Sequence, residues 1–174
     1  MKLKLLLTAL LTTLSLNAAV VVGEHPETVT IEGDNGGLVL DGAKWSSDSI
    51  KNSVYVMFYV DPDEKSVNEH FSAALKKKDY RKKGNFGSIA IINLAATWKP
   101  NFVIEKILKS KQEEFPDTIY VKDKKSVLVK DWGIEDDASN ILIFDKTGKL
   151  LFYKSGKMSD EDMKKAFSLI EANL

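Results

Sequence analysis

Val54-Tyr55-Val56-Met57-Phe58-Tyr59-Val60 is a continuous apolar and aromatic run, and Asp61-Pro62-Asp63-Glu64 follows it without a gap. The first segment has the length and the β-branched and aromatic content of a buried strand. The second combines a proline with carboxylates, which is typical of the first turn of a helix. The two segments together predict a central strand that runs directly into a helix.

The residues after this junction alternate between helical and strand patterns. Ser88-Ile89-Ala90-Ile91-Ile92-Asn93-Leu94 is almost entirely apolar, which predicts a second strand covered on both faces. Pro100 and Asn101 open a predicted helix, in which Glu105 and Lys109 form an i,i+4 pair. The apolar faces of the helices after the first and second strands are formed by Val67, Phe71, Ala74 and Leu75, and by Val103, Ile104, Ile107 and Leu108.

The carboxyl-terminal third predicts shorter elements. These are a strand at 118–121, a short helix at 126–130, and a hairpin with arms at 141–144 and 150–153 around a turn at 145–148. Ser159, with Asp162 three residues later, predicts a capped terminal helix. The buried stripe of that helix is expected at Met163, Ala166, Phe167 and Ile170.

On the amino side of the central strand, Val29-Thr30-Ile31 and Leu38-Val39-Leu40 flank the turn sequence Gly33-Asp34-Asn35-Gly36-Gly37. This pattern predicts an N-terminal β-hairpin. Strand–helix alternation predicts a parallel centre for the sheet, and the closing hairpin adds antiparallel strands. The fold class is therefore α/β with a mixed central sheet.

Residues 1–18 have the composition of a secretory signal peptide. Lys2 and Lys4 precede the apolar stretch 5–16, which is too short to cross a hydrocarbon layer of roughly 30 Å comfortably. We expect cleavage near Ala18 or Ala19, a periplasmic location, and a single domain over 19–174. An uncleaved N-terminal anchor is the alternative. A lipoprotein is excluded because the chain has no cysteine to acylate.

The charge balance argues against a nucleic-acid partner. Without Lys2 and Lys4, the chain has 23 basic and 25 acidic residues, a net charge of −2. Such a balance lacks the basic footprint that phosphate binding requires. The basic run 76–83, interrupted by Asp79, is interpreted as a solvated helix end rather than an anion or membrane contact. We expect membrane contact only through the signal peptide.

Three blocks carry a family resemblance. They are Ile91-Ile92-Asn93 before a proline-containing helix start, the segment 132–140 (Trp-Gly-Ile-Glu-Asp-Asp-Ala-Ser-Asn), and the segment 141–148 (Ile-Leu-Ile-Phe-Asp-Lys-Thr-Gly). Over most of 54–174 the chain resembles thioredoxin-like and peroxiredoxin-like domains, and most closely the YtfJ family of exported bacterial proteins. The resemblance implies a thioredoxin-like three-layer sandwich with an N-terminal β-hairpin and a C-terminal helix.

The resemblance also shows what this chain lacks. Asp61-Pro62-Asp63-Glu64 stands where a thioredoxin-type enzyme carries its redox dithiol, and Ser139 stands where such folds place a cis-proline. A cis bond before a non-proline residue costs about 2.5–4 kcal/mol, so we expect a trans bond before Ser139. With no thiolate, thiol–disulfide exchange and thiol peroxidase chemistry are excluded. The resemblance therefore implies a scaffold used for another purpose.

The same alignment brings three segments, 61–64, 95–101 and 135–140, to one edge of the sheet. We call this edge the rim. Its candidate ligand or partner residues are Asp61, Pro62, Asp63, Glu64, Trp98, Asp136, Asp137 and Ser139. The carboxylates either cap a helix and are solvated, or bind Ca²⁺ or Mg²⁺. Trp98 either covers the edge of the core or anchors a partner.

Two function hypotheses follow. The first is an exported, non-catalytic binding or accessory protein that uses the rim to hold an unknown protein or small ligand, with no cofactor. The alternative is an enzyme that depends on a divalent cation held by the acidic rim. The sequence contains no nucleophile–base constellation, phosphate-binding loop or metal-spaced His/Cys set that would specify a reaction.

Overall fold

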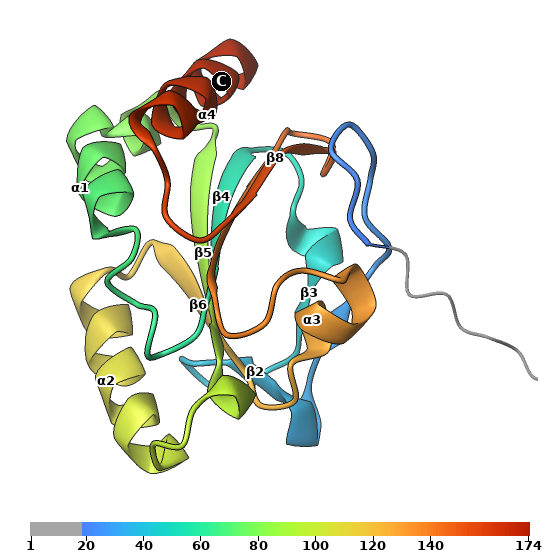
Figure 1. Cartoon of the computed structure of the whole chain (residues 1–174), viewed down its shortest axis with the longest axis vertical. Helices are drawn as coiled ribbons and strands as arrows, with labels where there is room; N and C mark the ends of the chain where they lie inside the picture. The colour runs from blue at the N-terminus through green and yellow to red at the C-terminus, as the bar shows by residue number, and fades with distance from the viewer. Residues whose placement is uncertain (1–18) are drawn as a thin grey trace, which may run out of the picture.

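The computed structural model describes residues 19–174 (Figure 1). The predicted signal peptide, 1–18, lies outside the described residues. Within 19–174, no helix combines the length and the apolar character needed to span a membrane.

The centre of the molecule is a six-stranded mixed sheet with the strand order β2-β6-β5-β4-β7-β8. Its strands are β2 (Gly36–Leu38), β4 (Val54–Val60), β5 (Phe86–Asn93), β6 (Thr118–Asp123), β7 (Ser139–Phe144) and β8 (Leu150–Ser155). Strands β4, β5 and β6 are parallel, whereas β7, β8 and β2 add antiparallel pairs. The predicted parallel centre and antiparallel closing hairpin are confirmed.

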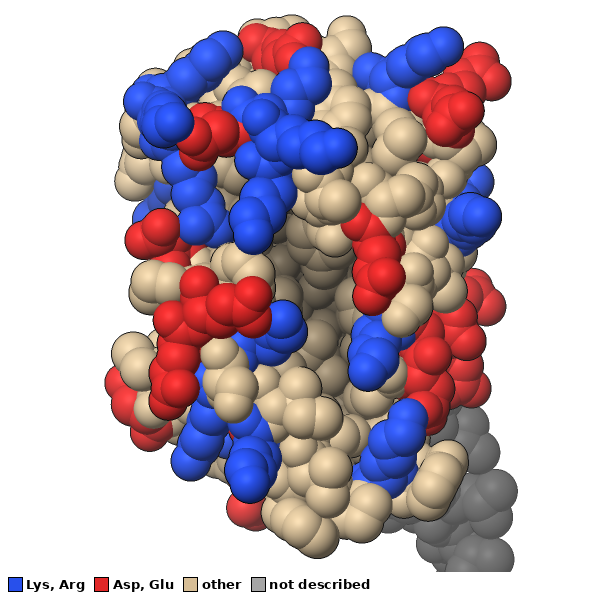
Figure 2. Space-filling model, turned by 90° about the vertical axis from the view of Figure 1, so that its left-hand side faces the viewer, with Lys and Arg blue, Asp and Glu red and all other residues tan. Residues whose placement is uncertain are grey.

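The helices lie on both faces of this sheet. They are α1 (Glu69–Lys78), α2 (Asn101–Glu114), α3 (Val127–Trp132) and α4 (Asp160–Asn173). Helices α1, α2 and α4 cover one face, and α3 covers the other together with the N-terminal strands (Figure 1). Figure 2 looks onto the first of these faces, where a hollow opens between charged side chains. The predicted three-layer arrangement is confirmed.

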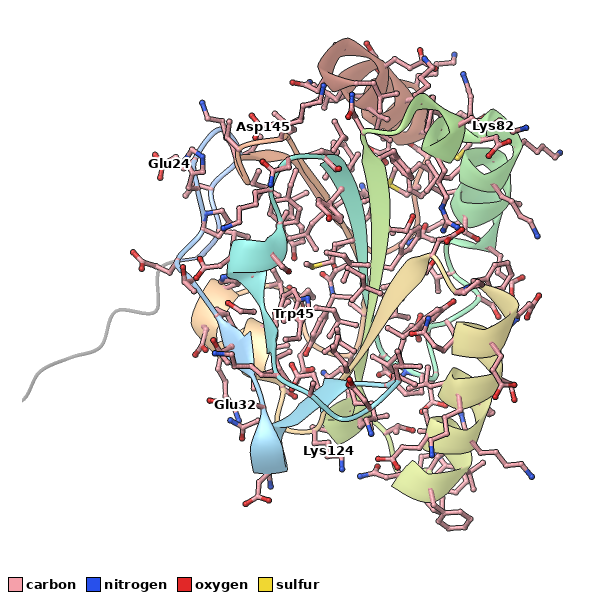
Figure 3. All side chains as sticks on the ribbon, turned by 180° about the vertical axis from the view of Figure 1, so that it is seen from behind. Glu24, Glu32, Trp45, Lys82, Lys124 and Asp145 are labelled. Carbon is pink, nitrogen blue, oxygen red and sulfur yellow. The ribbon has the colours of Figure 1, made fainter. Side chains whose placement is uncertain are left out.

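Side-chain alternation along the strands divides the core into two clusters. On β4, Val54 and Val56 pack toward α1 and α4, whereas Met57 and Tyr59 pack toward α3. Trp45 lies in the second cluster, between the N-terminal strands and the main sheet (Figure 3). Because successive strand side chains point to opposite faces, one apolar strand supplies both cores.

The predicted N-terminal hairpin is wrong in its pairing. Strand β1 (Thr30–Ile31) pairs with β3 (Trp45–Ser46), and β2 pairs with β6 instead of with β1. Gly36 explains the close docking of β2, because a Cβ built there would lie 1.8 Å from the carbonyl oxygen of Lys122. Glycine alone permits this approach and the positive φ of 129°.

Two helices differ from their predicted form. Helix α1 begins at Glu69 rather than directly after β4, and turns occupy 61–68. In α2, Ile104 and Leu108 are buried, but Val103 and Ile107 are 40% and 50% exposed. The expected partner of Glu105 is also wrong, since its carboxylate pairs with lysines of the strand β6 region and not with Lys109. Helical periodicity predicts which side of a helix is buried, but tertiary packing determines how wide the buried face is.

Strands β4 and β5 were predicted to be covered on both faces. The face toward α1, α2 and α4 is covered only in part. Ile91 is fully buried, whereas Phe58 and Ile92, which face the helical layer, remain half-buried. The helical layer therefore leaves part of the sheet open. By contrast, the predicted capping box of α4 is present, with Ser159 and Asp162 bonding each other's backbone N–H groups.

Candidate functional site

The rim lies where the three parallel strands end and the antiparallel β7 begins. Val60 pairs with Ser139, and the backbone N–H of Asp61 donates to the carbonyl of Ala138 at 3.0 Å. The structure therefore places the 61–64 turn and the 135–140 loop side by side, as predicted. Within residues 19–174 every peptide bond is trans, including the one before Ser139.

Asp61 is a buried residue at the head of the rim. Its side chain is 4% exposed, and one carboxylate oxygen accepts the backbone N–H of Asp63 at 2.8 Å. Burial raises the pKa of Asp61, and the neighbouring carboxylates of Asp63, Asp137 and Glu64 raise it further. Asp61 therefore shapes the turn after β4 and does not cap α1, which begins eight residues later.

Asp63 connects two of the rim segments. Its carboxylate accepts the Thr97 hydroxyl at 2.8 Å and forms an ion pair with the Lys99 ammonium. Hydrogen bonds from Lys99 and Thr97 lower the pKa of Asp63. The carboxylate is thus ionised at neutral pH and fixes the loop that follows β5.

Trp98 stands between these two anchored residues and projects into solvent. It is 86% exposed, so it does not cover the edge of the core. Phe102, Val103 and Ile107 of the following helix are also exposed, Phe102 by 74%. We call these four residues the Trp98 patch. Most of the large exposed apolar side chains of residues 19–174 belong to it.

The acidic loop 135–137 is tied to the end of β5. The Asn93 side-chain amide donates to the Asp136 carboxylate at 2.8 Å, and the backbone N–H of Glu135 donates to the Tyr153 hydroxyl at 3.0 Å. Asp137 occupies the left-handed region at φ 47°. Asp136 and Asp137 are exposed, so this loop presents its carboxylates to solvent.

Ser139 does not belong to the exposed rim. It is 2% exposed, and its hydroxyl accepts the Asn68 side-chain amide at 3.0 Å. The same amide reaches the carbonyl of Gly156, and the Asn68 oxygen accepts the N–H of Met158. Ser139 therefore helps to join the start of α1 to the end of β8. Pro62 is also buried, so neither residue offers a surface to a ligand.

A layer of buried polar side chains lies beneath the rim, and the sequence patterns did not predict it. Asn93 bonds Ser126, and Asn140 accepts the Tyr153 hydroxyl and donates to the carbonyl of Glu135. Asn93 and Asn140 interrupt or end apolar runs in the sequence. An asparagine in such a position could have indicated a buried polar side chain. Because buried polar groups require partners, the layer fixes the loops that carry the rim.

The end of β6 adds a buried carboxylate to this layer. The Tyr59 hydroxyl donates to Asp123 at 3.1 Å, and both residues are at most 1% exposed. The N–H groups of Lys125 and Leu128 also donate to Asp123. Burial and the nearby Asp123 raise the pKa of Tyr59. With three donors on one carboxylate, this group orients α3 against the sheet.

Three of the six rim carboxylates have separate partners within the protein. Asp63 is held by Lys99, Asp136 by Asn93, and Asp61 by a backbone N–H group. In the part of the chain that the structure describes, no three His, Asp or Glu side chains gather closely enough to hold a metal ion. No feature of the rim specifically favours the cation-dependent alternative.

Solved structures with this arrangement of elements are thioredoxin-like. The thioredoxin domain of a thiol-disulfide oxidoreductase from Bacteroides vulgatus superimposes with a TM-score of 0.58 at 15% identity, covering 87% of this chain and 98% of that one. A peroxiredoxin-like protein from Aquifex aeolicus gives a TM-score of 0.57 at 15% identity, covering 87% and 89%. At this identity the similarity establishes the fold alone, and the predicted thioredoxin-like fold is confirmed.

Sequence comparisons identify the family. An uncharacterized protein of Haemophilus influenzae is 42% identical over 69 residues, which span 40% of this chain and 37% of that protein. The family described as bacterial protein of unknown function (YtfJ_HI0045) matches residues 19–173, almost the whole described chain. The chain therefore belongs to the YtfJ family, on a thioredoxin-like fold that carries no cysteine.

Proposed function

We propose that this protein is an exported, non-redox binding or accessory protein that holds a protein partner at its rim. One observation carries the proposal: Trp98 is 86% exposed although the residues on either side of it are fixed to Asp63. Monomeric proteins rarely expose contiguous large apolar side chains without an interaction partner. Tryptophan is also among the residues that contribute most to binding free energy at interfaces.

Preorganisation of the loop supports a binding role. Thr97 and Lys99 both bond Asp63, so the backbone that carries Trp98 is ordered before any partner arrives. Binding then costs less conformational entropy than the ordering of a free loop would. Phe102 lies four residues further along the chain, at the start of α2, and adds a second aromatic anchor.

The charge of the rim indicates the chemistry of the partner. Segments 61–64, 95–101 and 135–140 contain six carboxylates and one lysine. Such a surface repels anionic lipid headgroups and attracts basic side chains. We infer a protein partner that presents an apolar pocket for Trp98, surrounded by lysines or arginines.

The proposed location is the periplasm, after removal of residues 1–18 or 1–19. The supporting feature is the leader composition, with Lys2 and Lys4 before an apolar stretch. Mass measurement of the protein from a periplasmic fraction tests this. A mass matching a chain that starts just after Ala18 or Ala19 supports the proposal, whereas recovery of the full 174-residue chain contradicts it.

Site-specific photo-cross-linking in cells tests the partner. A photoreactive phenylalanine analogue at position 98 or 102 is expected to capture the same protein, and the analogue at the exposed control position Val22 is not. With the analogue at 102, Trp98→Ala should lower the yield about tenfold or more. Val22→Ala is the matched control and should leave the yield unchanged.

Two results would overturn the proposal. The first is a yield at position 102 that is equal in the Trp98→Ala and Val22→Ala variants. The second is a product containing only two copies of this chain. Because Trp98 is exposed, its removal should not change the melting temperature, so a lost cross-link is not caused by unfolding.

A further inference from the structure

The helical face of the sheet contains a cavity that the rim does not share. It has a volume of about 820 Å³ and lies between α1, α2 and the strands beneath them. Figure 2 shows the corresponding hollow, open to solvent, with an uncharged interior and charged side chains around its edge. Ligand pockets typically have volumes of about 300–1,000 Å³, so this cavity is large enough for a small molecule.

The cavity originates in two small side chains on β5. Ser88 and Ala90 point toward the helical layer, at positions where a larger side chain would fill the space between α1 and α2. Phe86, Ser88 and Ala90 form a floor over four residue steps, about 13 Å along the strand. The cavity is therefore a slot and not an irregular packing defect.

The walls of the slot are aromatic. Five aromatic residues line it, from β4, the turn after α1, β5, the end of α2 and β6: Phe58, Tyr80, Phe86, Phe115 and Tyr120. Tyr80 and Phe86 also contact each other in a tilted arrangement, with ring centroids 5.6 Å apart. This lining favours an apolar ligand body.

Charges at the mouth of the slot are arranged asymmetrically. Glu69 stands at the start of α1, and Lys76 stands seven residues later, about 10 Å along the helix axis. At the Lys76 end, Asp79 is neutralised by Lys82 at 2.6 Å, and Arg81 bonds Asp117 at 3.0 Å. These two ion pairs cancel in charge, so Lys76 gives this end of the slot its net positive charge.

Lys76 is the cation that remains for a ligand. Its ammonium lies 5.0 Å from the centre of the Phe115 ring, directly at the slot. Among the described residues, no carboxylate lies within ion-pairing distance of it. An anionic group placed at this end would gain a charge-assisted hydrogen bond, whereas the Glu69 end would repel it.

We propose that this slot binds a long-chain carboxylate of the fatty-acid class. The acyl chain lies over Ser88 and Ala90 between the aromatic walls, and the carboxylate meets Lys76 at the cationic end. The floor accommodates the part of the acyl chain next to the carboxylate. Among the described residues that line the slot, Lys76 is the cation without a carboxylate partner, which fits one carboxylate. No residue of the rim lines the slot, so this site is independent of the proposed partner surface.

Displacement of a fluorescent polyene fatty acid by palmitate, below the micelle concentration, tests the proposal. Wild type should bind palmitate saturably, and Ser88→Leu should abolish binding by filling the slot. Lys76→Ala should weaken palmitate binding about tenfold but leave binding of the neutral alcohol hexadecanol unchanged. Lys77→Ala, its exposed neighbour outside the slot, is the matched control and should bind palmitate like wild type.

Several outcomes would overturn the proposal. Absence of saturable binding to wild type contradicts it, as does unchanged binding to Ser88→Leu. Equal affinities of Lys76→Ala and Lys77→Ala would disprove the placement of the carboxylate. Loss of binding in Trp98→Ala but not in Ser88→Leu would assign the ligand to the Trp98 patch. If Ser88→Leu fails to fold, Ala90→Val fills the same slot with a smaller change.

Discussion

At the scale of single residues, Asp61 and Asp63 show how position decides the role of a carboxylate. They are two residues apart, yet burial raises the pKa of Asp61 while hydrogen bonds from Lys99 and Thr97 lower that of Asp63. An ionised Asp61 is therefore a source of instability, whereas an ionised Asp63 stabilises the loop after β5.

Asp61→Asn should increase the free energy of unfolding at neutral pH. Asparagine keeps the oxygen that accepts the Asp63 N–H but carries no charge. A pKa raised by folding means that protonation favours the folded state, so the wild type gains stability as the pH falls through that pKa. The two proteins should therefore converge in acid. Urea melts across this pH range measure the difference.

Asp63→Asn is the matched control and should behave in the opposite way. A pKa lowered by folding gives stability at neutral pH that is lost as the pH falls through it, so this variant should be less stable than wild type only at neutral pH. If both variants lose stability equally at neutral pH, the assignment of Asp61 as an unfavourable buried carboxylate is wrong.

At the scale of elements, β5 separates a closed face of the sheet from an open one. Ile91 is fully buried toward α3, and Ile92 is half-buried toward the helical layer. Ile91→Ala should reduce the free energy of unfolding by about 2–5 kcal/mol, and Ile92→Ala by clearly less, because partial exposure leaves less contact to lose. Urea melts of this neighbouring pair test it. Equal losses would mean that both faces are equally well packed.

The capping box of α4 allows a second test at this scale. Ser159→Ala removes the acceptor for the Asp162 N–H and should reduce the free energy of unfolding by about 1 kcal/mol. Ser110→Ala, at an exposed position within α2, should change it by at most about 0.5 kcal/mol. Equal effects in chemical denaturation would show that the box contributes no stability.

At the scale of the whole molecule, the fold resembles that of thiol enzymes, but the chain has no thiol. The purified protein should therefore show no insulin reduction and no peroxide consumption above a denatured sample, because both reactions start from a thiolate. Turnover clearly above that control would mean that another group does the chemistry, and the non-redox assignment would fail.

The sequence by itself determined the order of the elements, the mixed sheet, the capped terminal helix and the lack of thiol chemistry. These depend on residue type and local periodicity, which a chain carries in any conformation. The resemblance to thioredoxin-like domains also placed 61–64 and 135–140 together, because the two segments are neighbours at one sheet edge in such folds.

Only the tertiary structure decided which side chains of this fold remain exposed to a ligand or a partner. Strand β2 pairs with β6, where Gly36 permits the close approach, and β1 pairs with β3 instead. Ser139 is buried and accepts a hydrogen bond from Asn68, which is distant in the chain. The exposure of Trp98 and the slot above Ser88 depend on how far the helices extend over the sheet. Such contacts join residues that are distant in the chain. Local sequence patterns do not specify which distant residue a given side chain or strand will contact.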